Sequence, residues 1–170
     1  MATKIQAKTS TDEKIMQKPL WDSESISNAL GIDVAKDIKV NSVSIDSRNI
    51  QNNALFIGIK GENHNGNFFA IDALEKGASL CIVDEMPQGA DKYKGAIIKV
   101  ESSLDALNKL AAYSRQRLKG KVIGVTGSLG KTSIKEMLRI ALENQGETYA
   151  TVGNFNNHYG LPLSLSNIHE

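Results

Sequence analysis

A short glycine-rich turn that runs into lysine and threonine is the strongest constraint on what this chain can fold into. The surrounding segment, residues 122–138, reads VIGVTGSLGKTSIKEML. An apolar run precedes the turn and an amphipathic pattern follows it, which predicts a strand ending at Val125 and a helix beginning near Lys131. Glycines at positions 127 and 130 supply backbone freedom where several N–H groups converge on one anion. The order strand, turn, helix predicts an α/β fold with an anion-binding loop.

The chemistry of this loop indicates a nucleoside triphosphate. Backbone N–H groups and the positive end of the helix would surround phosphate oxygens, and Lys131 would reach the β- and γ-phosphates. The Thr132 hydroxyl is placed to ligate Mg²⁺. We therefore expect ATP and Mg²⁺ as cofactors, Lys131 as the catalytic residue and Thr132 as a metal ligand. The expected cofactor-binding residues are Gly127, Ser128, Leu129, Gly130, Lys131, Thr132 and Ser133.

Two other interpretations of the same letters stay open. The general phosphate-loop pattern has a glycine six residues before the lysine, where this chain has Val125. A simple glycine turn beside an exposed lysine would give a similar string. A dinucleotide fold fits less well, because Gly124, Gly127 and Gly130 are evenly spaced and do not follow G-x-G-x-x-G.

Composition excludes several other classes of function. The chain has 170 residues, a formal net charge of +1, three histidines and one cysteine. This balance gives no basic field for nucleic acid or for an anionic membrane, and the cysteine and histidines show no metal-ligand spacing. No run approaches the ~20 apolar residues of a membrane span, and the N-terminus lacks the apolar core of a signal peptide. We expect a cytoplasmic protein.

The pattern along the chain predicts a flexible tail at residues 1–18 and a small α/β domain at residues 19–118. The first helix is expected to be capped by Asp22 and closed by Gly31, with Trp21 and Ile26 forming a hydrophobic staple. Cys81 is expected in the core. Further strands and helices follow from the apolar periodicity. The strands are expected within residues 40–48, 53–61, 79–85 and 95–101, and the helices within 65–78 and 102–120, the latter with Leu104, Leu107, Ala111, Ser114 and Leu118 near one face.

Residues 119–170 are expected to begin a second, parallel-sheet domain. A buried strand at 121–127, a helix at 131–146 and another strand at 147–153 would form one right-handed unit. Because parallel sheets are buried on both faces, a sheet of about two strands cannot cover itself. We expect this domain to be only begun at residue 170, with an open edge that favours association. The expected apolar stripe of the helix is Ile134, Met137, Leu138, Ala141 and Leu142.

Three segments resemble the Mur ligases, a family of ATP-dependent enzymes of peptidoglycan synthesis. The loop VTGSLGKTS looks like theirs, including its short glycine spacing. Residues 44–78, SIDSRNIQNNALFIGIKGENHNGNFFAIDALEKGA, are similar to the uridine-nucleotide domain of the tripeptide-adding and dipeptide-adding members. Residues 151–165, TVGNFNNHYGLPLSL, are similar to the member that adds D-alanyl-D-alanine. The resemblance covers about residues 20–168.

This resemblance implies a fold, a reaction and further site residues. The fold would be a small N-terminal uridine-nucleotide domain followed by the start of a P-loop central domain. The reaction would activate the carboxylate of UDP-N-acetylmuramoyl-tripeptide with the γ-phosphoryl group of ATP, and D-alanyl-D-alanine would attack the acyl phosphate. The implied substrate-binding residues are Ser47, Arg48, Asn154, Asn156 and Asn157.

Each of these assignments has an alternative. Asp46, Ser47 and Arg48 could form a turn in which Asp46 bonds its own backbone and Arg48 is solvated, and the asparagines could be loop formers. Where the family usually has Asp-Gly-His, this chain has Asn65-Gly66-Asn67, which puts contacts from that turn in doubt. The sibling that adds the third amino acid, or a UDP-nucleotide-binding module without turnover, would share much of the pattern. The 170-residue chain alone is expected to be inactive, because the rest of the implied site lies outside it.

Overall fold

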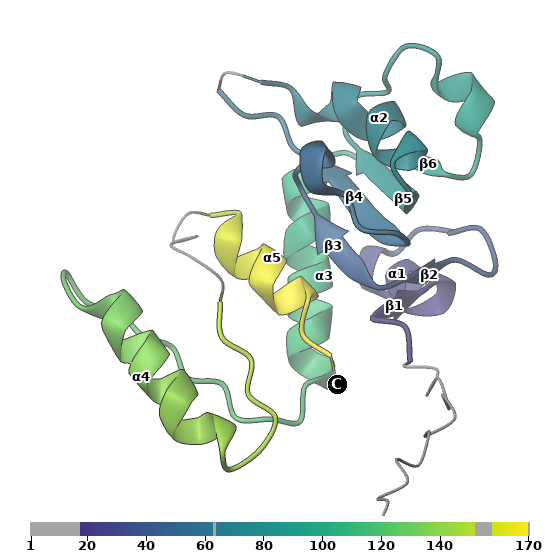
Figure 1. The fold of residues 1–170 in the computed structure, drawn as a ribbon. Coiled ribbons are helices and arrows are strands. Elements are labelled where there is room, and N and C mark those ends of the chain that lie inside the picture. The colour runs from purple at the N-terminus through teal and green to yellow at the C-terminus, as the bar shows by residue number, and fades with distance from the viewer. Residues whose placement is uncertain (1–17, 63, 152–157, 170) are drawn as a thin grey trace, which may run out of the picture.

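A four-stranded parallel sheet forms the centre of the molecule, which we describe from a computed structural model covering residues 18–62, 64–151 and 158–169 (Figure 1). The sheet confirms the α/β fold class. Its strands lie in sequence order, with β3 and β6 at the edges. They are β3 (Ser42–Ser44), β4 (Ala54–Gly58), β5 (Ala78–Val83) and β6 (Ile97–Lys99). The expectations for residues 1–17 and for Asn154, Asn156 and Asn157 lie outside the described residues.

The first helix, α1 (Ser23–Leu30), begins and ends where the sequence predicts. The Asp22 carboxylate accepts from the Ser25 amide at 2.8 Å, and the Ser25 hydroxyl accepts from the Asp22 amide at 2.9 Å. This reciprocal pair satisfies two amide donors at the helix N-terminus. Gly31 ends the helix with a φ of 69°. Two short antiparallel strands, β1 (Trp21–Asp22) and β2 (Lys39–Val40), tie the entry of this helix to the chain that leads into β3.

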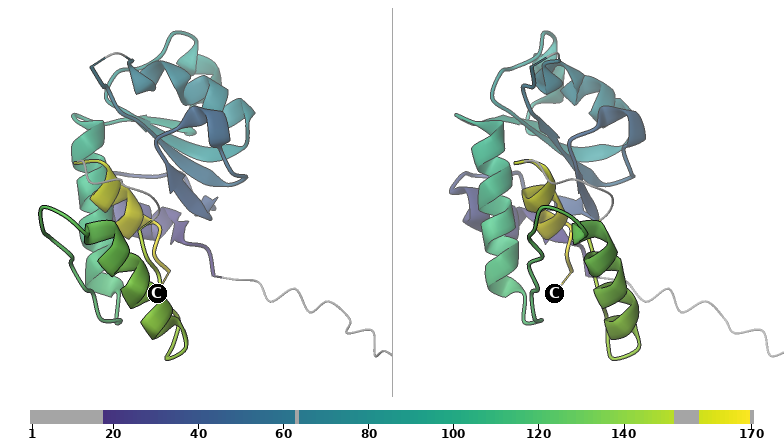
Figure 2. Two further views of the ribbon diagram at one scale, coloured as in Figure 1. Left: turned by 60° about the vertical axis from the view of Figure 1, so that its left-hand side comes forward. Right: turned by 90° about the vertical axis from the view of Figure 1, so that its left-hand side faces the viewer.

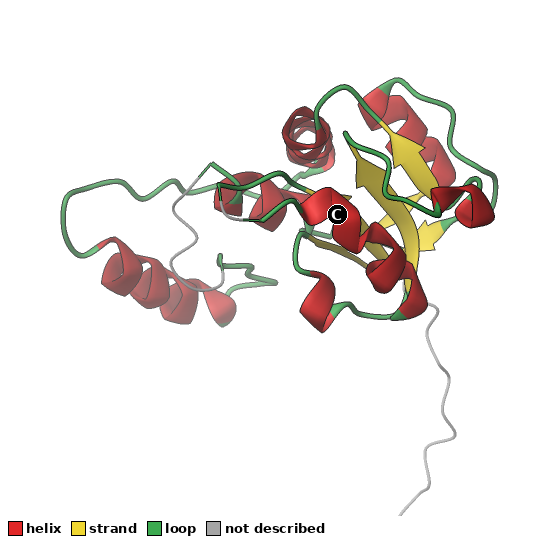
Figure 3. Cartoon of the chain, turned by 90° about the horizontal axis from the view of Figure 1, so that it is seen from above, coloured by secondary structure: helices red, strands yellow, loops and turns green. Residues whose placement is uncertain are grey.

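Alternation along the strands divides the core into two layers. Leu55 and Ile57 of β4 pack in a cluster with α1 and α3 (Ser103–Arg117), whereas Phe56 packs in a second cluster with α2 (Ala70–Glu75). Figure 3 shows helices on both sides of the strands. Both faces of the sheet are therefore covered, as a parallel sheet requires, and this explains the nearly continuous apolar runs of β4 and β5. Cys81 lies fully buried in the second cluster, as predicted.

A close backbone contact fixes the turn between β4 and α2. This turn contains a 3₁₀ helix, η2 (Gly66–Phe69), which folds back against the end of β4. A Cβ atom on Gly66 would lie 2.5 Å from the carbonyl oxygen of Ile59, and one on Gly58 would lie 2.8 Å from the Cα of Asn67. Side chains at either position would therefore push the two segments apart.

α3 and α5 (Gly160–Ser166) lie side by side (Figure 2). α3 starts at its serine cap, Ser102, and buries Leu107, Ala111 and Ser114 of the predicted face, while Leu104 and Leu118 are half-buried. α5 was not predicted from the sequence. It packs on α3 and β3 of the preceding α/β unit, and the predicted domain boundary at residue 118 stays a prediction. No helix in the described ranges is long and apolar enough to cross a membrane.

Residues 121–127 and 147–151 do not form the strands that the sequence predicts, and the expected strand–helix–strand unit is wrong for this structure. Val122 and Ile123 are 48% and 56% exposed. The reason is physical: a strand requires a hydrogen-bonded neighbour, and no described strand pairs with either segment. The helix between them, α4 (Lys131–Glu143), does form, but it stands apart from the sheet and buries none of its residues (Figure 1).

We predict that Gly66→Ala lowers the free energy of unfolding by about 1–3 kcal/mol or more, because the new methyl group overlaps the Ile59 carbonyl. Urea denaturation followed by circular dichroism measures the change. Gly146→Ala is the matched control, since a Cβ there meets nothing within 4 Å. An equal urea midpoint for Gly66→Ala and wild type would show that the turn is not closely packed.

Candidate functional site: a glycine loop and an aspartate-arginine turn

The loop before α4 adopts the backbone conformations for which the sequence supplies glycine. Gly127 has a φ of 151° and Gly130 a φ of 80°, both in the region that side chains disfavour. Gly130 is the N-cap of α4, and no side chain caps the helix there. Leu129 at the tip of the loop is 89% exposed. The loop therefore presents backbone groups and the positive end of a helix to solvent.

The first residues of α4 place three polar side chains beside this loop. Lys131 bends back so that its Nζ donates to the carbonyl of Gly127, which closes the loop with a charge-assisted hydrogen bond. Thr132 and Ser133 follow on the exposed first turn. An anion bound over the loop would meet the Lys131 ammonium and the α4 amides together. The structure thus brings the seven loop residues, 127–133, into one arrangement.

α4 is linked to the segment that follows it. Lys135 donates from Nζ to the carbonyl of Thr151 and forms an ion pair with Glu136 at 3.0 Å. Two residues before Thr151, partial burial raises the pKa of the Tyr149 hydroxyl, and its hydrogen bond with Ser164 of α5 opposes that rise. Residues 149–151 therefore contact both α4 and α5.

The second group of expected site residues lies at the carboxyl end of β3. Asp46 caps a 3₁₀ turn, η1 (Ser47–Asn49), by accepting from the Arg48 amide at 3.0 Å. The same carboxylate accepts from Nε and Nη2 of Arg48, each at 2.8 Å. These bonds to Arg48 lower the pKa of Asp46 to about 2. The alternative in which Asp46 bonds its own backbone is therefore realised, with the Arg48 side chain 83% exposed.

Ser47 is buried under this turn. Its carbonyl accepts from Nζ of Lys76 at 3.1 Å. A hydrogen bond from the Ser47 hydroxyl also helps to lower the pKa of Asp72, although the larger cause is the hydrogen bond from Lys76. Ser47 therefore supports the turn from inside, and Arg48 is the member of the pair that faces solvent.

The glycine loop and the Asp46 turn are not brought together in this structure. The turn follows β3 on the sheet, whereas the loop and α4 lie well apart from the sheet (Figures 1 and 3). Each group is therefore a separate local arrangement. Among the described residues, no group of three or more histidine, cysteine, aspartate or glutamate side chains is placed to hold a metal ion.

A buried polar network that the sequence did not reveal ties the β4–α2 turn to the rest of the domain. Asn67 is fully buried, and its Nδ2 donates to Asn65 Oδ1 at 2.7 Å and to Asp84 Oδ1 at 2.6 Å. Its Oδ1 accepts from the Asp84 amide at 3.0 Å, and the other Asp84 oxygen accepts from the Ser103 amide at 3.2 Å. The Asn65-Gly66-Asn67 departure therefore makes contacts within the protein. Sequence reasoning missed them because Asp84 is 17 residues away from Asn67.

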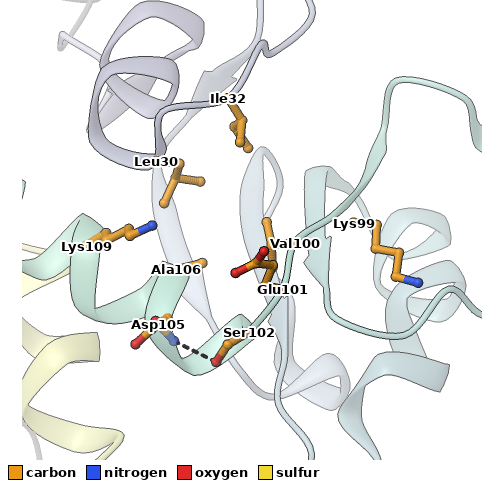
Figure 4. Close-up of a pocket in the computed structure, with 9 residues that line it drawn as sticks. All are labelled: Leu30, Ile32, Lys99, Val100, Glu101, Ser102, Asp105, Ala106 and Lys109. Atoms are coloured by element: carbon orange, nitrogen blue, oxygen red, sulfur yellow. Dashed lines mark hydrogen bonds between the residues drawn. The ribbon is translucent and has the colours of Figure 1, made fainter.

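A pocket of about 490 Å³ lies between the end of α1, the end of β6 and the start of α3 (Figure 4). Figure 4 shows Leu30, Ile32 and Glu101 around its space, while Lys99 extends away from it. None of the expected site residues lines this pocket. Its lining consists of Leu30, Ile32, Lys99, Val100, Glu101, Ser102, Asp105, Ala106 and Lys109.

We predict a pH-dependent stability contribution from Asp46. Its folded pKa of about 2 lies below the ordinary 3.8, so its bond to Arg48 is fully stabilising above about pH 4 and is lost as the pH falls through about 2. Asp46→Asn should cost less than about 1 kcal/mol at neutral pH, because water screens the exposed pair. Urea denaturation across this pH range checks the prediction, with Asp91→Asn, an exposed carboxylate elsewhere, as control. A cost for Asp46→Asn that persists unchanged at the acid end would contradict it.

Comparison with known proteins places both parts of the chain in one family. The sequence model of the family described as "Mur ligase family, catalytic domain" matches residues 39–115. The family model described as "Mur ligase middle domain" matches residues 125–170. UDP-N-acetylmuramoyl-tripeptide--D-alanyl-D-alanine ligase of Rickettsia prowazekii is 40% identical over 149 residues, which are 88% of this chain and 32% of that protein. The ligase of the same name from Bacillus subtilis is 40% identical over 127 residues, 74% of this chain and 27% of that protein.

Solved structures give the same result. The crystal structure of MurF from Acinetobacter baumannii matches with a TM-score of 0.75 and 30% identity, over 88% of this chain and 33% of that one. The MurF ligase of Thermotoga maritima in complex with ADP matches with a TM-score of 0.65 and 37% identity, over 80% of this chain and 31% of that one. The chain spans 27–33% of the length of these relatives. On these matches, which cover both the sheet domain and the glycine loop, the chain belongs to the Mur ligase family.

Proposed function

We propose that this chain supplies the uridine-nucleotide and phosphate-binding parts of an ATP-dependent ligase that joins D-alanyl-D-alanine to UDP-N-acetylmuramoyl-tripeptide. The observation that carries the proposal is the loop at residues 127–133, where two glycines, a helix start without a side-chain cap and Lys131 converge. The names of the relatives from Rickettsia prowazekii and Bacillus subtilis supply the reaction and its substrates. The Thermotoga maritima relative in complex with ADP supports a nucleotide as the ligand.

The geometry of the loop fits the phosphates of ATP. Amides at the start of α4 would donate to phosphate oxygens, and Lys131 would exchange the Gly127 carbonyl for one of them. Bound ATP would supply the phosphoryl group that activates the peptide carboxylate. The loop amides and Lys131 would stabilise the negative charge that develops on the oxygens. Thr132 would provide one ligand to Mg²⁺, and phosphate oxygens and water would provide others.

Ser47 and Arg48 would contact the uridine diphosphate part of the substrate. Asp46 engages Nε and Nη2 of Arg48, so that Nη1 at the exposed end of the guanidinium would meet the pyrophosphate. The fixed pair gives the arginine a set orientation before the ligand arrives, which lowers the entropic cost of binding. Asn154, Asn156 and Asn157, which lie outside the described residues, would orient the sugar or pyrophosphate with their amide donors and acceptors.

We also propose a cytoplasmic location. The single cysteine supports it, because an oxidising compartment favours paired cysteines in structural bridges. Burial raises the pKa of the Cys81 thiol to about 12, so this side chain acts as an apolar core residue and not as a nucleophile.

The sibling ligase that adds the third amino acid is the second candidate. UDP-N-acetylmuramoyl-L-alanyl-D-glutamate--2,6-diaminopimelate ligase of Clostridium tetani is 35% identical over 127 residues, 73% of this chain and 26% of that protein. The D-alanyl-D-alanine reaction is favoured because relatives bearing that name reach 40% identity. Protection of the chain against proteolysis by UDP-N-acetylmuramoyl-tripeptide, but not by the dipeptide precursor, would favour the D-alanyl-D-alanine ligase. The reverse result would favour the sibling.

We predict that Lys131→Ala weakens binding of MgADP by about tenfold or more, since it removes charge-assisted bonds to phosphate. Isothermal titration calorimetry measures the dissociation constant. Lys119→Ala is the matched control, because it removes the same charge from an exposed position ahead of the loop. Equal affinity of both variants for MgADP would place the nucleotide elsewhere.

The 170-residue chain alone is expected to bind nucleotides without forming product. Its described residues lack a carboxylate cluster that could complete the metal site. Mass spectrometry after incubation with ATP, Mg²⁺, UDP-N-acetylmuramoyl-tripeptide and D-alanyl-D-alanine should detect no new amide. A product peak above that of the Lys131→Ala chain would contradict this expectation.

A further inference from the structure

β3 is an edge strand, and one of its residues is paired by a side chain where a neighbouring strand would otherwise lie. In a parallel pair, the backbone groups of alternate residues point to opposite sides of the strand. The Val43 amide donates to Asn167 Oδ1 at 2.8 Å, and the Val43 carbonyl accepts from Asn167 Nδ2 at 2.9 Å. The carboxamide therefore satisfies both outward-facing groups of this residue. We call these two bonds the edge clamp.

The edge clamp fastens the end of α5 to the sheet. Nδ2 of Asn167 also donates to the carbonyl of Leu163 at 2.9 Å, so the carboxamide is held by its own helix while it pairs with β3. One residue earlier, the carbonyl of Ser166 accepts from Trp21 Nε1 at 2.9 Å. Trp21 is fully buried, with the Arg117 guanidinium 4.2 Å from its ring centroid. Two successive residues thus join α5 to separate points of the N-terminal sheet domain.

Ser44, which follows Val43 in β3, holds the aspartate-arginine turn. The Ser44 hydroxyl accepts from the Asp46 amide at 3.1 Å and donates to the Asp46 carbonyl at 3.2 Å. Asp46 in turn orients the Arg48 guanidinium through two bonds of 2.8 Å. A continuous set of contacts therefore runs from Asn167 through β3 to Arg48. Displacement of Val43 would shift the strand end that positions this arginine.

We propose that Asn167 is a positioning residue for the turn at Asp46–Arg48 and thereby for the pyrophosphate of a uridine diphosphate ligand. This inference rests on the proposed contact of Ser47 and Arg48 with that ligand. Asn167 lies outside the turn, 124 positions along the chain from Val43. Nucleotide binding at Lys131 should not depend on the clamp, because the contacts that join α5 to α4 run through residues 149–151 to Lys135 and not through the glycine loop.

The substitution Asn167→Asp tests this role with little change of shape. Aspartate keeps the acceptor for the Val43 amide but replaces the donor with an oxygen that faces the carbonyls of Val43 and Leu163. Asn108→Asp makes the same chemical change at an exposed position of α3 and is the matched control. Circular dichroism establishes that both variants are folded. Asn167→Gln, which keeps donor and acceptor on a longer arm, serves as the conservative variant.

Two measurements are made on the 170-residue chain. In Asn167→Asp, amide hydrogen exchange at residues 44–48 should accelerate, because the lost donor weakens the end of β3. The dissociation constant for UDP should rise by up to about tenfold, because Arg48 must then be ordered on binding. The dissociation constant for MgADP should stay within about twofold, because the two sites are distant. Asn167→Gln should recover part of the UDP affinity, and Asn108→Asp should match wild type in both measurements.

Unchanged exchange at residues 44–48 in Asn167→Asp would overturn the inference and leave the proposed function standing. Equal weakening of UDP and MgADP binding would also overturn it, because Asn167 would then serve general stability. Failure of the wild-type chain to bind UDP would refute the proposed role of Ser47 and Arg48, and the inference with it. That last outcome is recognised without any variant, so the two failures are distinguishable.

Discussion

The rest of this structure depends on one constraint: each parallel strand needs a hydrogen-bonded neighbouring strand, and each face of the sheet needs helices packed on it. β3 to β6 satisfy it, because each strand has a hydrogen-bonded neighbour and helices cover both faces of the sheet. The segments on either side of α4, residues 121–127 and 147–151, pair with no described strand, and Val122 and Ile123 are exposed. The two parts of the chain therefore differ in how they are held together. The sheet domain positions its turn through many contacts, whereas the glycine loop is organised mainly by its own backbone and by Lys131.

Local signals in the sequence predicted the local structure well. Asp22 and Gly31 mark the ends of α1, Ser102 marks the start of α3, and Gly127 and Gly130 take the unusual φ values that the loop requires. These features depend on residues within one or two turns of each other, so a single sequence contains the necessary information. The prediction of α4 succeeded for the same reason.

Long-range pairing is what the sequence could not supply. Val122 and Ile123 have strand propensity, but propensity does not provide a neighbouring strand, and the prediction of a buried strand was wrong. The hydrogen bonds of Asn167, Asn67 and Asp84 join residues far apart in the chain, so nothing near these residues in the sequence indicates their partners. The Asp46 turn shows both sides of this limit. The sequence indicates the bond from the Arg48 amide to the Asp46 carboxylate as one alternative. It does not indicate the two further bonds from the Arg48 guanidinium to the same carboxylate.

The docking of α5 has an optical consequence. The chain contains a single tryptophan, and that residue is the one whose indole N–H bonds to the last residue of α5 while a guanidinium covers its ring. Its fluorescence therefore originates at the junction between the end of α5 and the sheet domain. Release of α5 would remove the hydrogen bond and admit water to the indole, which shifts emission to longer wavelength. The protein thus carries its own spectroscopic reporter of whether these two parts are joined.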